Sequence, residues 1–338
     1  MNRTRNKLIS WFSALVVLAA IGLPYPAIGA EKVVLQLRWD HQFQFAGYYA
    51  ALWKGFYADV GLDVEIRSAF EPDKRYHKAT EEVSKARAQF GTGAIDVLQA
   101  RDGGAPLVIV ASIFQQSPVA FFAKTETGLK SPADLTRLTV ATNPASGAAN
   151  GELRAMLRAE NIDPSLVHQQ PIREKLGLFD LEKGYADVVA GFTISAGWVA
   201  RERGMTLTAL RPAAYGVDFY GDALFTHQAL IDKDPDLVQR FVAASIKGWE
   251  YALSNAGEIA ERIARDLPRT LPIKDALGFN KFQSNVVRGL MQFPVVQVGH
   301  INPARWQRMH SALSDIGLVS GPFDGPALIF NPDRLRRE

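Results

Sequence analysis

The sequence predicts an α/β fold of two lobes, in which parallel or mixed sheets are covered by helices on both faces. Short apolar runs alternate along the chain with stretches of helical spacing. One run, residues 106–113 (PLVIVASI), is almost continuously apolar, as is typical of a strand buried on both faces. The residues that follow position 30, 308 of the 338, are too many for one simple core, which indicates two lobes.

The expected strands are short. Residues 33–37 (VVLQL) form the first, and residues 62–66 alternate between apolar and polar side chains, as a half-buried strand does. Further strands are expected at residues 94–98, 106–113, 119–123, 138–141, 187–190 and 207–210.

Helices are expected between these strands and through most of the last third of the chain. Phe45, Tyr49, Leu52 and Phe56 stand at helical spacing and predict a helix over residues 45–57. Ser131 followed by Pro132 has the form of a capped helix start. Other helices are expected at residues 74–85, 152–160, 234–265, 277–291 and 303–316.

The first thirty residues have the layout of a secretory signal peptide. Three basic residues among the first seven precede an apolar run at residues 9–20, and small residues stand at 27–30. The alternative is a retained membrane anchor, but the run is shorter than the roughly 20 residues that a spanning helix needs. We therefore expect cleavage after residue 30 and a periplasmic location.

Composition excludes several function classes. Without its first thirty residues the chain has 35 basic and 35 acidic residues, so the pI of about 9.0 does not indicate a nucleic-acid partner. The absence of cysteine excludes disulfides, thiolate metal sites and a cysteine nucleophile. The six histidines are scattered, so no metal site is expected, and the sequence has no G-x-S-x-G, H-E-x-x-H or P-loop motif.

Ligands of open α/β sheets bind in the loops at the carboxyl ends of strands. Four loops meet this condition here: those after Leu37, Ile113, Ala141 and Ala190. The sequence therefore predicts a ligand site built from these four loops.

Four blocks of sequence resemble a known family. They are residues 37–51 (LRWDHQFQFAGYYAA) with 54–57 (KGFY) and 61–64 (GLDV), residues 110–118 (VASIFQQSP), residues 215–226 (YGVDFYGDALFT) and residues 241–253 (FVAASIKGWEYAL). Together they resemble the substrate-binding proteins of ABC transporters for thiamine-pyrimidine precursors, and their relatives for sulfonates, nitrate and riboflavin. The resemblance covers nearly the whole chain after residue 30.

The resemblance implies a type II periplasmic binding protein, whose two lobes close on a ligand. Mapped onto this chain, lobe one would be residues 31–116 plus 223–338, and lobe two residues 117–222. The two crossing segments would fall near residues 115–119 and 220–224.

Candidate ligand residues follow the first strand. The indole of Trp39 could stack on a flat heterocycle or pack at the rim of the core. Asp40 could accept from a ring amino group or cap the helix at residues 45–57. Of the next two tyrosines, Tyr49 is expected in the core, which leaves Tyr48 as the candidate for the cleft.

Further candidates stand at the crossings and in the small-residue loop. Gln115 and Ser117 suit the orientation of a neutral ligand. The backbone of the loop at residues 142–150 could bind an anion or form an ordinary turn. Its candidate residues are Asn143, Ser146 and Gly147.

Acidic and aromatic residues gather at the second crossing. Asp218, Tyr220 and Asp222 would favour a ligand with amino or hydroxyl donors, or they could cap a helix or hold the hinge. Trp198 is either a second stacking wall or a core residue. For a sulfonate or nitrate, the nearby cations are Arg38 and Arg101.

These residues predict a receptor for a flat heterocycle such as a pyrimidine, and the resemblance implies that it delivers its ligand to an ABC permease and ATPase. We expect a monomer without a cofactor or a nucleic-acid partner. One alternative is a thiamine pyrimidine synthase-like enzyme that uses pyridoxal phosphate and histidine. Such enzymes have a Lys four residues before the His and a Cys-rich stretch, and this chain has neither. The other alternative is a ligand-sensing partner of a membrane signalling protein.

Overall fold

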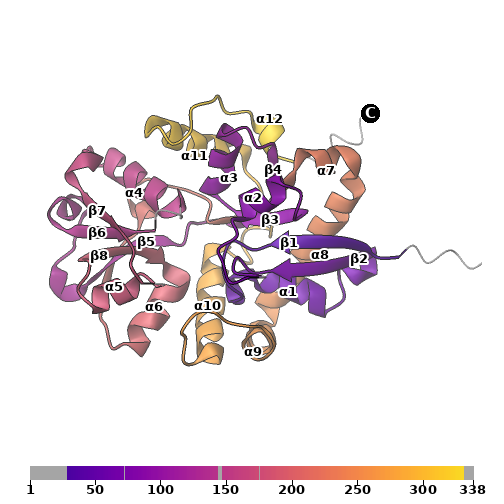
Figure 1. Cartoon of the computed structure of the whole chain (residues 1–338), viewed down its shortest axis with the longest axis horizontal. Helices are drawn as coiled ribbons and strands as arrows, with labels where there is room; N and C mark the ends of the chain where they lie inside the picture. Colours follow the sequence, from indigo (N-terminus) through magenta and orange to yellow (C-terminus); the bar gives the residue numbers. More distant parts are fainter. Residues whose placement is uncertain (1–28, 72, 144–146, 175, 331–338) are drawn as a thin grey trace, which may run out of the picture.

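A computed structural model describes residues 29–71, 73–143, 147–174 and 176–330. Within these ranges the chain forms two lobes, each built around a five-stranded sheet and lying side by side in Figure 1. The α/β class with mixed sheets is confirmed. The expected signal peptide lies outside the described residues except for its last two positions. No described helix is both long enough and apolar enough to cross a membrane.

The sheet of the first lobe has the spatial order β2-β1-β3-β10-β4. Its strands are β1 (Glu31–Gln36), β2 (Leu62–Arg67), β3 (Phe90–Gly93), β4 (Leu107–Phe114) and β10 (Asp222–His227). β1 runs parallel to β2 and β3, whereas β10 runs antiparallel to β3 and β4. The chain therefore leaves this sheet after β4 and returns to its interior with β10.

The sheet of the second lobe has the order β7-β6-β8-β5-β9. Its strands are β5 (Val119–Lys124), β6 (Thr139–Thr142), β7 (His168–Pro171), β8 (Val188–Phe192) and β9 (Leu207–Leu210). β6 is parallel to β7 and β8, and β5 is antiparallel to β8 and β9. Residues 115–118 and 211–221 connect the two sheets.

Helices surround both sheets. The first lobe carries α1 (Ala46–Trp53), α2 (Ala79–Ser84), α3 (Ile95–Asp102), α7 (Gln228–Lys233), α8 (Pro235–Ser254), α9 (Ala256–Asp266), α10 (Ala276–Leu290), α11 (Pro303–Asp315) and α12 (Gly325–Leu328). The second lobe carries α4 (Gly147–Ala159), α5 (Leu178–Glu182) and α6 (Thr193–Glu202). Single turns of 3₁₀ helix include η1 (Phe43–Phe45) before α1 and η2 (Ala58–Val60) after it. The longer η4 (Pro132–Arg137) begins at the predicted Ser131–Pro132 cap.

Two glycines allow α1 and α8 to pack closely in the core of the first lobe. A Cβ atom on Gly248 of α8 would lie 2.2 Å from the carbonyl oxygen of Gly47 in α1. A Cβ atom on Gly47 would lie 2.0 Å from Cγ of Trp249, which is fully buried. No side chain larger than hydrogen fits at either position in this packing.

The strand predicted at residues 94–98 is wrong. Residues 95–102 form α3, and the strand is β3, just before it. Two of the four residues of β3 are glycine because the ring of Phe225 in β10 covers them: a Cβ on Gly91 would lie 2.5 Å from its Cζ. A strand with so few side chains has no apolar alternation for the sequence to show.

Two predicted helices are shorter than expected. The helix expected at residues 45–57 spans 46–53, and Gly55, with a φ of 77°, follows its end in the left-handed region. The charged segment at residues 74–85 is helical only from 79 to 84. Its earlier part is a loop, and that loop reaches the site described next.

Candidate functional site

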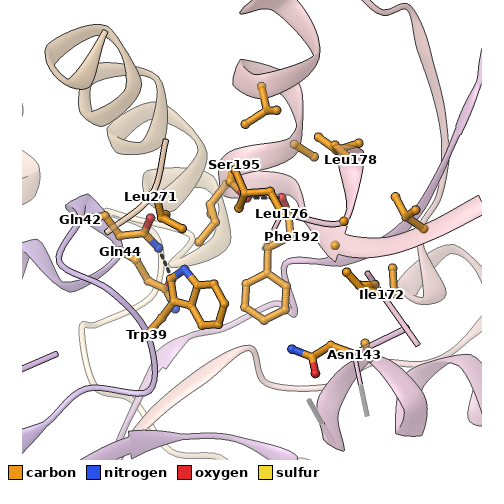
Figure 2. A pocket seen from close by; sticks show the side chains of 18 of the residues that line it. Trp39, Gln42, Gln44, Asn143, Ile172, Leu176, Leu178, Phe192, Ser195 and Leu271 are labelled. Atoms are coloured by element: carbon orange, nitrogen blue, oxygen red, sulfur yellow. Dashed lines mark hydrogen bonds between the residues drawn. The ribbon is translucent and has the colours of Figure 1, made fainter. Parts of the chain in front are cut away.

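A cavity of about 300 Å³ lies between the two lobes. Residues after β1, β6 and β8 line it, together with the segment between α9 and α10. Figure 2 shows their side chains directed into this space from both lobes. Three of the four loops predicted from strand ends therefore contribute to one cavity, and the loop after Ile113 does not.

The wall from the first lobe is polar and aromatic. Its lining residues are Arg38, Trp39, Gln42, Gln44, Tyr76, Lys78 and Asp96, with Leu271, Ile273 and Phe279 from the segment around the start of α10. The Trp39 indole is half-buried and packs edge-on against Phe70, with ring centroids 5.3 Å apart. The contact with Phe70 therefore leaves one face of the Trp39 indole available to the cavity.

The wall from the second lobe is mostly apolar. Its lining residues are Asn143, Ala149, Ile172, Glu174, Leu176, Gly177, Leu178, Val189, Ala190, Gly191, Phe192, Ile194, Ser195, Ala196 and Val199. Phe192, at the end of β8, points its ring into the cavity, as does Trp39 from the opposite lobe (Figure 2). The cavity thus has an aromatic ring on each of its two walls.

Arg38 lies on the cavity wall, but its guanidinium is already bound to other groups of the protein. It forms an ion pair with Asp96 at 3.7 Å and donates to the carbonyl of Gly221 at 3.1 Å. The guanidinium also lies 5.9 Å from the ring centroid of Phe192. Among the charged lining residues, Arg38 and Lys78 are balanced by Asp96 and Glu174.

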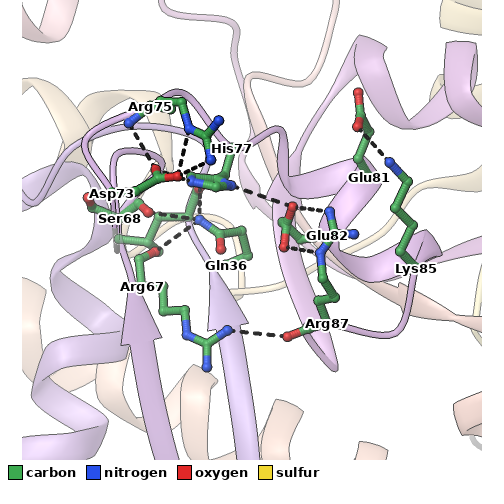
Figure 3. Close-up of polar contacts among 11 residues, drawn as sticks. Gln36, Arg67, Ser68, Asp73, Arg75, His77, Glu81, Glu82, Lys85 and Arg87 are labelled. Carbon is green, nitrogen blue, oxygen red and sulfur yellow. Dashed lines mark hydrogen bonds and ion pairs between the residues drawn. The ribbon is translucent and has the colours of Figure 1, made fainter.

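A network of polar contacts holds the loop that brings Tyr76 and Lys78 to the cavity (Figure 3). Gln36 in β1 donates to the carbonyl of Ser68 at 2.9 Å. Farther along, Asp73 accepts from His77 at 2.7 Å and from Arg75, so the loop is bonded within itself. These contacts fix the loop although it contains no helix or strand.

Four buried side chains form a line of hydrogen bonds behind and beside the cavity, which we term the amide relay. Gln283 Nε2 donates to Gln42 Oε1 at 3.0 Å, and Gln42 Nε2 donates to Gln44 Oε1 at 2.7 Å. Gln44 Nε2 then donates to Asp222 Oδ2 at 3.1 Å. None of the four residues is more than 3% exposed, and Gln42 and Gln44 line the cavity.

Two buried carboxyl groups lie near Arg38. Burial raises the pKa of Asp222 to about 7 and the pKa of Glu152 to about 8, although the Arg38 charge opposes both shifts. Glu152 Oε1 accepts a hydrogen bond from the Ser117 hydroxyl at 2.5 Å. The second oxygens, Glu152 Oε2 and Asp222 Oδ1, have no partner among the described residues.

Of the residues predicted from sequence, Trp39 and Asn143 line the cavity. Asp222 stands one residue behind it, in contact with Gln44. Gly147 is the first residue of α4, and Ser146 lies outside the described residues.

Asp40, predicted as a ligand residue, does not line the cavity. Its Oδ2 accepts from the backbone N–H and the hydroxyl of Thr270, at 2.7 and 2.6 Å. Its Oδ1 accepts from the backbone N–H of His41 at 3.0 Å. Both carboxylate oxygens of Asp40 therefore have partners within the protein. Asp40 does not cap α1. It holds the loop after β1 against the segment before α10.

Two tyrosines predicted at the cleft are core residues instead. Tyr48 is 1% exposed and packs edge-on against Trp249, with ring centroids 5.7 Å apart. Tyr220 is equally buried and stacks on Trp306 at 5.0 Å, and its hydroxyl accepts from the backbone of Asn302. Tyr49 lies in the core, as predicted.

The crossing residues are also occupied elsewhere. Gln115 donates to the carbonyls of Ser112 and His300, both at 3.0 Å, and Ser117 is bound to Glu152. Asp218 forms a surface ion pair with Arg305. None of these three residues lines the cavity, because their side chains bind other parts of the protein. Arg101 is also remote from the lining; it donates to the carbonyl of Leu107.

Sequence reasoning missed Gln42, Gln44 and Phe192. The two glutamines alternate with phenylalanines in the stretch HQFQF, and this alternation just after a strand end is a signal that the sequence did contain. The apolar wall of the second lobe had no such signal, because its side chains are of the same kinds as those in the core.

A contact between the lobes lies outside the cavity, where α6 meets α10. Trp198 of α6 packs against Phe282 of α10, with ring centroids 6.1 Å apart. It also covers Gly278, where a Cβ atom would lie 2.2 Å from Trp198 Cη2. Trp198 is therefore neither a stacking wall nor a simple core residue; it joins the two lobes in this structure.

We expect Gly278→Ala to shift the lobes apart. The added methyl group would overlap both Trp198 and the Asp275 carboxylate, which lies 2.2 Å from the Cβ position. Overpacking of this kind costs about 1–3 kcal/mol. This cost would shift the equilibrium between contacting and separated lobes roughly tenfold toward the separated state. Small-angle X-ray scattering should show a larger radius of gyration. Gly289→Ala on the same helix is the control, since nothing lies within 4 Å of that site; equal scattering curves for the two variants would contradict the expectation.

The fold recurs in solved structures. The periplasmic aliphatic sulphonate binding protein SsuA from Escherichia coli superposes with a TM-score of 0.67 at 14% identity, over 88% of this chain and 96% of that one. Two lobes joined by two crossing segments, with a cavity between strand ends, are the architecture of the periplasmic binding protein fold. The predicted fold is confirmed at this level.

A family model described as NMT1/THI5 like matches residues 42–259, which is more than half of the chain. The chain belongs to this family. It is 28% identical over 300 residues to the riboflavin-binding protein RibY of Chloroflexus aurantiacus, covering 87% of this chain and 83% of that protein. It is also 28% identical over 232 residues to the formylaminopyrimidine-binding protein of Halalkalibacterium halodurans, covering 68% of each. Both relatives are binding proteins, which confirms the prediction of a binding protein over an enzyme.

Proposed function

We propose that the protein binds a flat, uncharged heterocycle, with the isoalloxazine ring of a flavin first and a substituted pyrimidine second. The observation that carries this proposal is the composition of the cavity. It has an aromatic ring on each wall, buried amides on one side and paired charges.

Aromatic side chains favour a flat ligand. The indole of Trp39 and the ring of Phe192 enter the cavity from opposite lobes. A planar heterocycle between them can stack in offset or edge-on geometry with either ring. Because the two rings come from different lobes, a stacked ligand would join the lobes and stabilise their contact.

The charges of the cavity favour a neutral ligand over an anion. Arg38 is already bound to Asp96 and Gly221. Asp222 and Glu152, both fully buried, lie close enough to interact with it electrostatically. A sulfonate or nitrate would have to compete with these carboxyl groups for the same guanidinium. The likeness to sulfonate-binding proteins therefore supports the fold and not the ligand.

The apolar wall favours an extended ring system. Ile172, Leu176, Leu178, Val189 and Val199 all line the second lobe's side of the cavity. This wall offers aliphatic contact to the benzenoid part of an isoalloxazine, while Gln42 and Gln44 face its polar edge. One relative is named as a riboflavin-binding protein and the other as a formylaminopyrimidine-binding protein, which is consistent with both ligand classes.

We further propose that the protein works in the periplasm as a monomer without a cofactor, after removal of residues 1–30, and delivers its ligand to an ABC importer. The two binding-protein relatives support this role and give no support to a membrane sensor partner.

The test is a ligand panel with residues 31–338, unfolded and refolded to remove carried-over ligand. We expect riboflavin, and more weakly 4-amino-2-methylpyrimidines, to raise the midpoint of thermal unfolding in a saturable way, as mass action requires. Flavin fluorescence should fall on binding. A saturable response to taurine or nitrate alone, or to none of the panel, would contradict the proposal.

Replacement of Trp39 should separate stacking from general stability. We expect Trp39→Ala to weaken riboflavin binding about tenfold to hundredfold, the range for loss of one aromatic stacking partner. Tyr185→Ala is the control, because Tyr185 is 40% exposed on the second lobe and does not line the cavity. Fluorescence titration measures both. Equal affinities in the two variants would place the ligand elsewhere.

A further inference from the structure

We infer that Asp222 is a positioning residue, which fixes the direction of the amide relay and thereby the order of donors and acceptors that a ligand meets at Gln42 and Gln44. Asp222 does not itself line the cavity. It acts through Gln44, which does. The part of this inference that concerns ligand choice rests on the proposed function; the part that concerns the relay does not.

The direction of the relay follows from hydrogen-bond chemistry. An ionised carboxylate can only accept, so Gln44 must turn its Nε2 toward Asp222 Oδ2. The carbonyl of Gln44 is then left to accept from Gln42, and the carbonyl of Gln42 to accept from Gln283. Each amide is oriented by the one before it, starting at Asp222.

The far end of the relay does not fix its direction. Gln283 Oε1 is buried and has no hydrogen-bond partner among the described residues. If all three amides were reversed, Gln283 would have an unpaired Nε2 in place of an unpaired Oε1. Either direction therefore leaves one unsatisfied atom at this end, and only the carboxylate distinguishes the two.

The charge state of Asp222 thus determines the direction of the amide relay. The charged or titratable groups that interact with Asp222 from neighbouring elements are Arg38, Asp96 of α3 and Tyr48 of α1. Glu152 of α4 interacts in turn with Arg38. Burial raises the pKa of Asp222 to about 7, while Arg38 and the Gln44 amide lower it. Below that pH the neutral carboxyl can donate to Gln44, and the reversed relay becomes available.

The consequence for a ligand lies in the atoms that the relay leaves unused. Gln42 and Gln44 each keep one N–H and one carbonyl lone pair for the cavity. With the relay fixed, these donors and acceptors have set positions, so a heterocycle must present the complementary order along its edge. With the relay reversed, the nitrogen and oxygen of each amide exchange places.

The first test needs no ligand. In protein labelled with ¹⁵N-glutamine, the side-chain amide signals of Gln42 and Gln44 should titrate together with a midpoint near neutral pH. In Asp222→Asn they should not titrate. Asp232→Asn is the matched control, since it removes the carboxylate of a surface pair in which Gln228 donates to Asp232 at 2.7 Å. Flat signals in the unaltered protein between pH 5.5 and 8.5 would overturn the inference, whether or not the variant folds.

The second test uses riboflavin as the probe. Asp222→Asn should weaken binding about tenfold at pH 8, the effect of one misdirected hydrogen bond, and should abolish the pH dependence. The unaltered protein should lose a similar factor between pH 8 and pH 5.5. If the glutamine signals titrate but riboflavin and the pyrimidines do not bind, the proposed function fails and the relay stands. If riboflavin binds with an affinity that neither pH nor Asp222→Asn changes, the relay has no part in recognition and the inference fails.

Discussion

Replacing Gly248 with alanine should destabilise the first lobe by about 3 kcal/mol or more and sharply reduce the yield of folded protein. The new Cβ atom would lie 2.2 Å from the Gly47 carbonyl oxygen and 2.7 Å from the Ala51 backbone nitrogen. Backbone atoms cannot rotate away as the end of a flexible side chain can, so α1 and α8 would have to separate. Because the total stability of a domain is about 5–15 kcal/mol, this loss is a large fraction of it.

Urea unfolding followed by circular dichroism measures this effect. Gly257→Ala is the control, because Gly257 stands in the neighbouring helix α9 with nothing within 4 Å of its Cβ position. There, alanine should stabilise the protein by up to about 1 kcal/mol through its better helix propensity. A Gly248→Ala variant with an unchanged urea midpoint would show that α1 and α8 do not pack at this distance.

Glu152→Gln should remove a large part of the loss of stability that burial of this carboxyl group causes as pH rises from about 5 to 8. Burial raises the pKa of Glu152 from 4.5 to about 8. The folded state therefore holds a proton that the unfolded state releases above 4.5. Stability from this group is fully present below pH 4.5 and is lost progressively until the pH passes 8.

The size of the effect follows from the same shift. One pKa unit corresponds to about 1.4 kcal/mol, so the whole shift amounts to roughly 5 kcal/mol at most. The thermal midpoint of the unaltered protein should fall across this range, and that of Glu152→Gln should fall less. Asp222, whose pKa is raised to about 7, contributes in the same direction, so the double variant with Asp222→Asn should be flatter still. Glu250→Gln, an exposed change on α8, should leave the slope as it is; a parallel slope for Glu152→Gln would contradict the burial argument.

Much of the fold could be predicted because the strands that carry it are short apolar runs between turns. The run at residues 107–114 is β4, and the alternating residues 62–67 are β2. β3 could not be predicted in this way. Two of its four residues (FGTG) are glycine, because the ring of Phe225 in β10 covers them. Phe225 lies more than a hundred residues later in the chain, so no local pattern indicates this strand.

The cavity lies at strand ends, where the sequence predicts a site, but only some of the predicted residues line it. The rule that ligands bind at strand ends located Trp39 and Asn143 because it depends on chain order alone. It could not decide where a side chain at a strand end points. Asp40 shows the difference, since its partner Thr270 is separated from it by 230 residues. The orientation of Asp40 is set by that tertiary contact, and no local pattern records it.

The position of β10 also bears on how the chain folds as it is synthesised. β10 lies between β3 and β4, so until residue 227 has been made those two strands have exposed edges toward each other. The sheet of the second lobe is complete once residue 210 has been made. A nascent chain can therefore complete the sheet of the second lobe while the sheet of the first lobe still lacks the strand between β3 and β4. In a growing polypeptide, the exposed strand edges of the unfinished first sheet are where we expect a chaperone to bind. This need ends when β10, which follows the second crossing, pairs with β3 and β4.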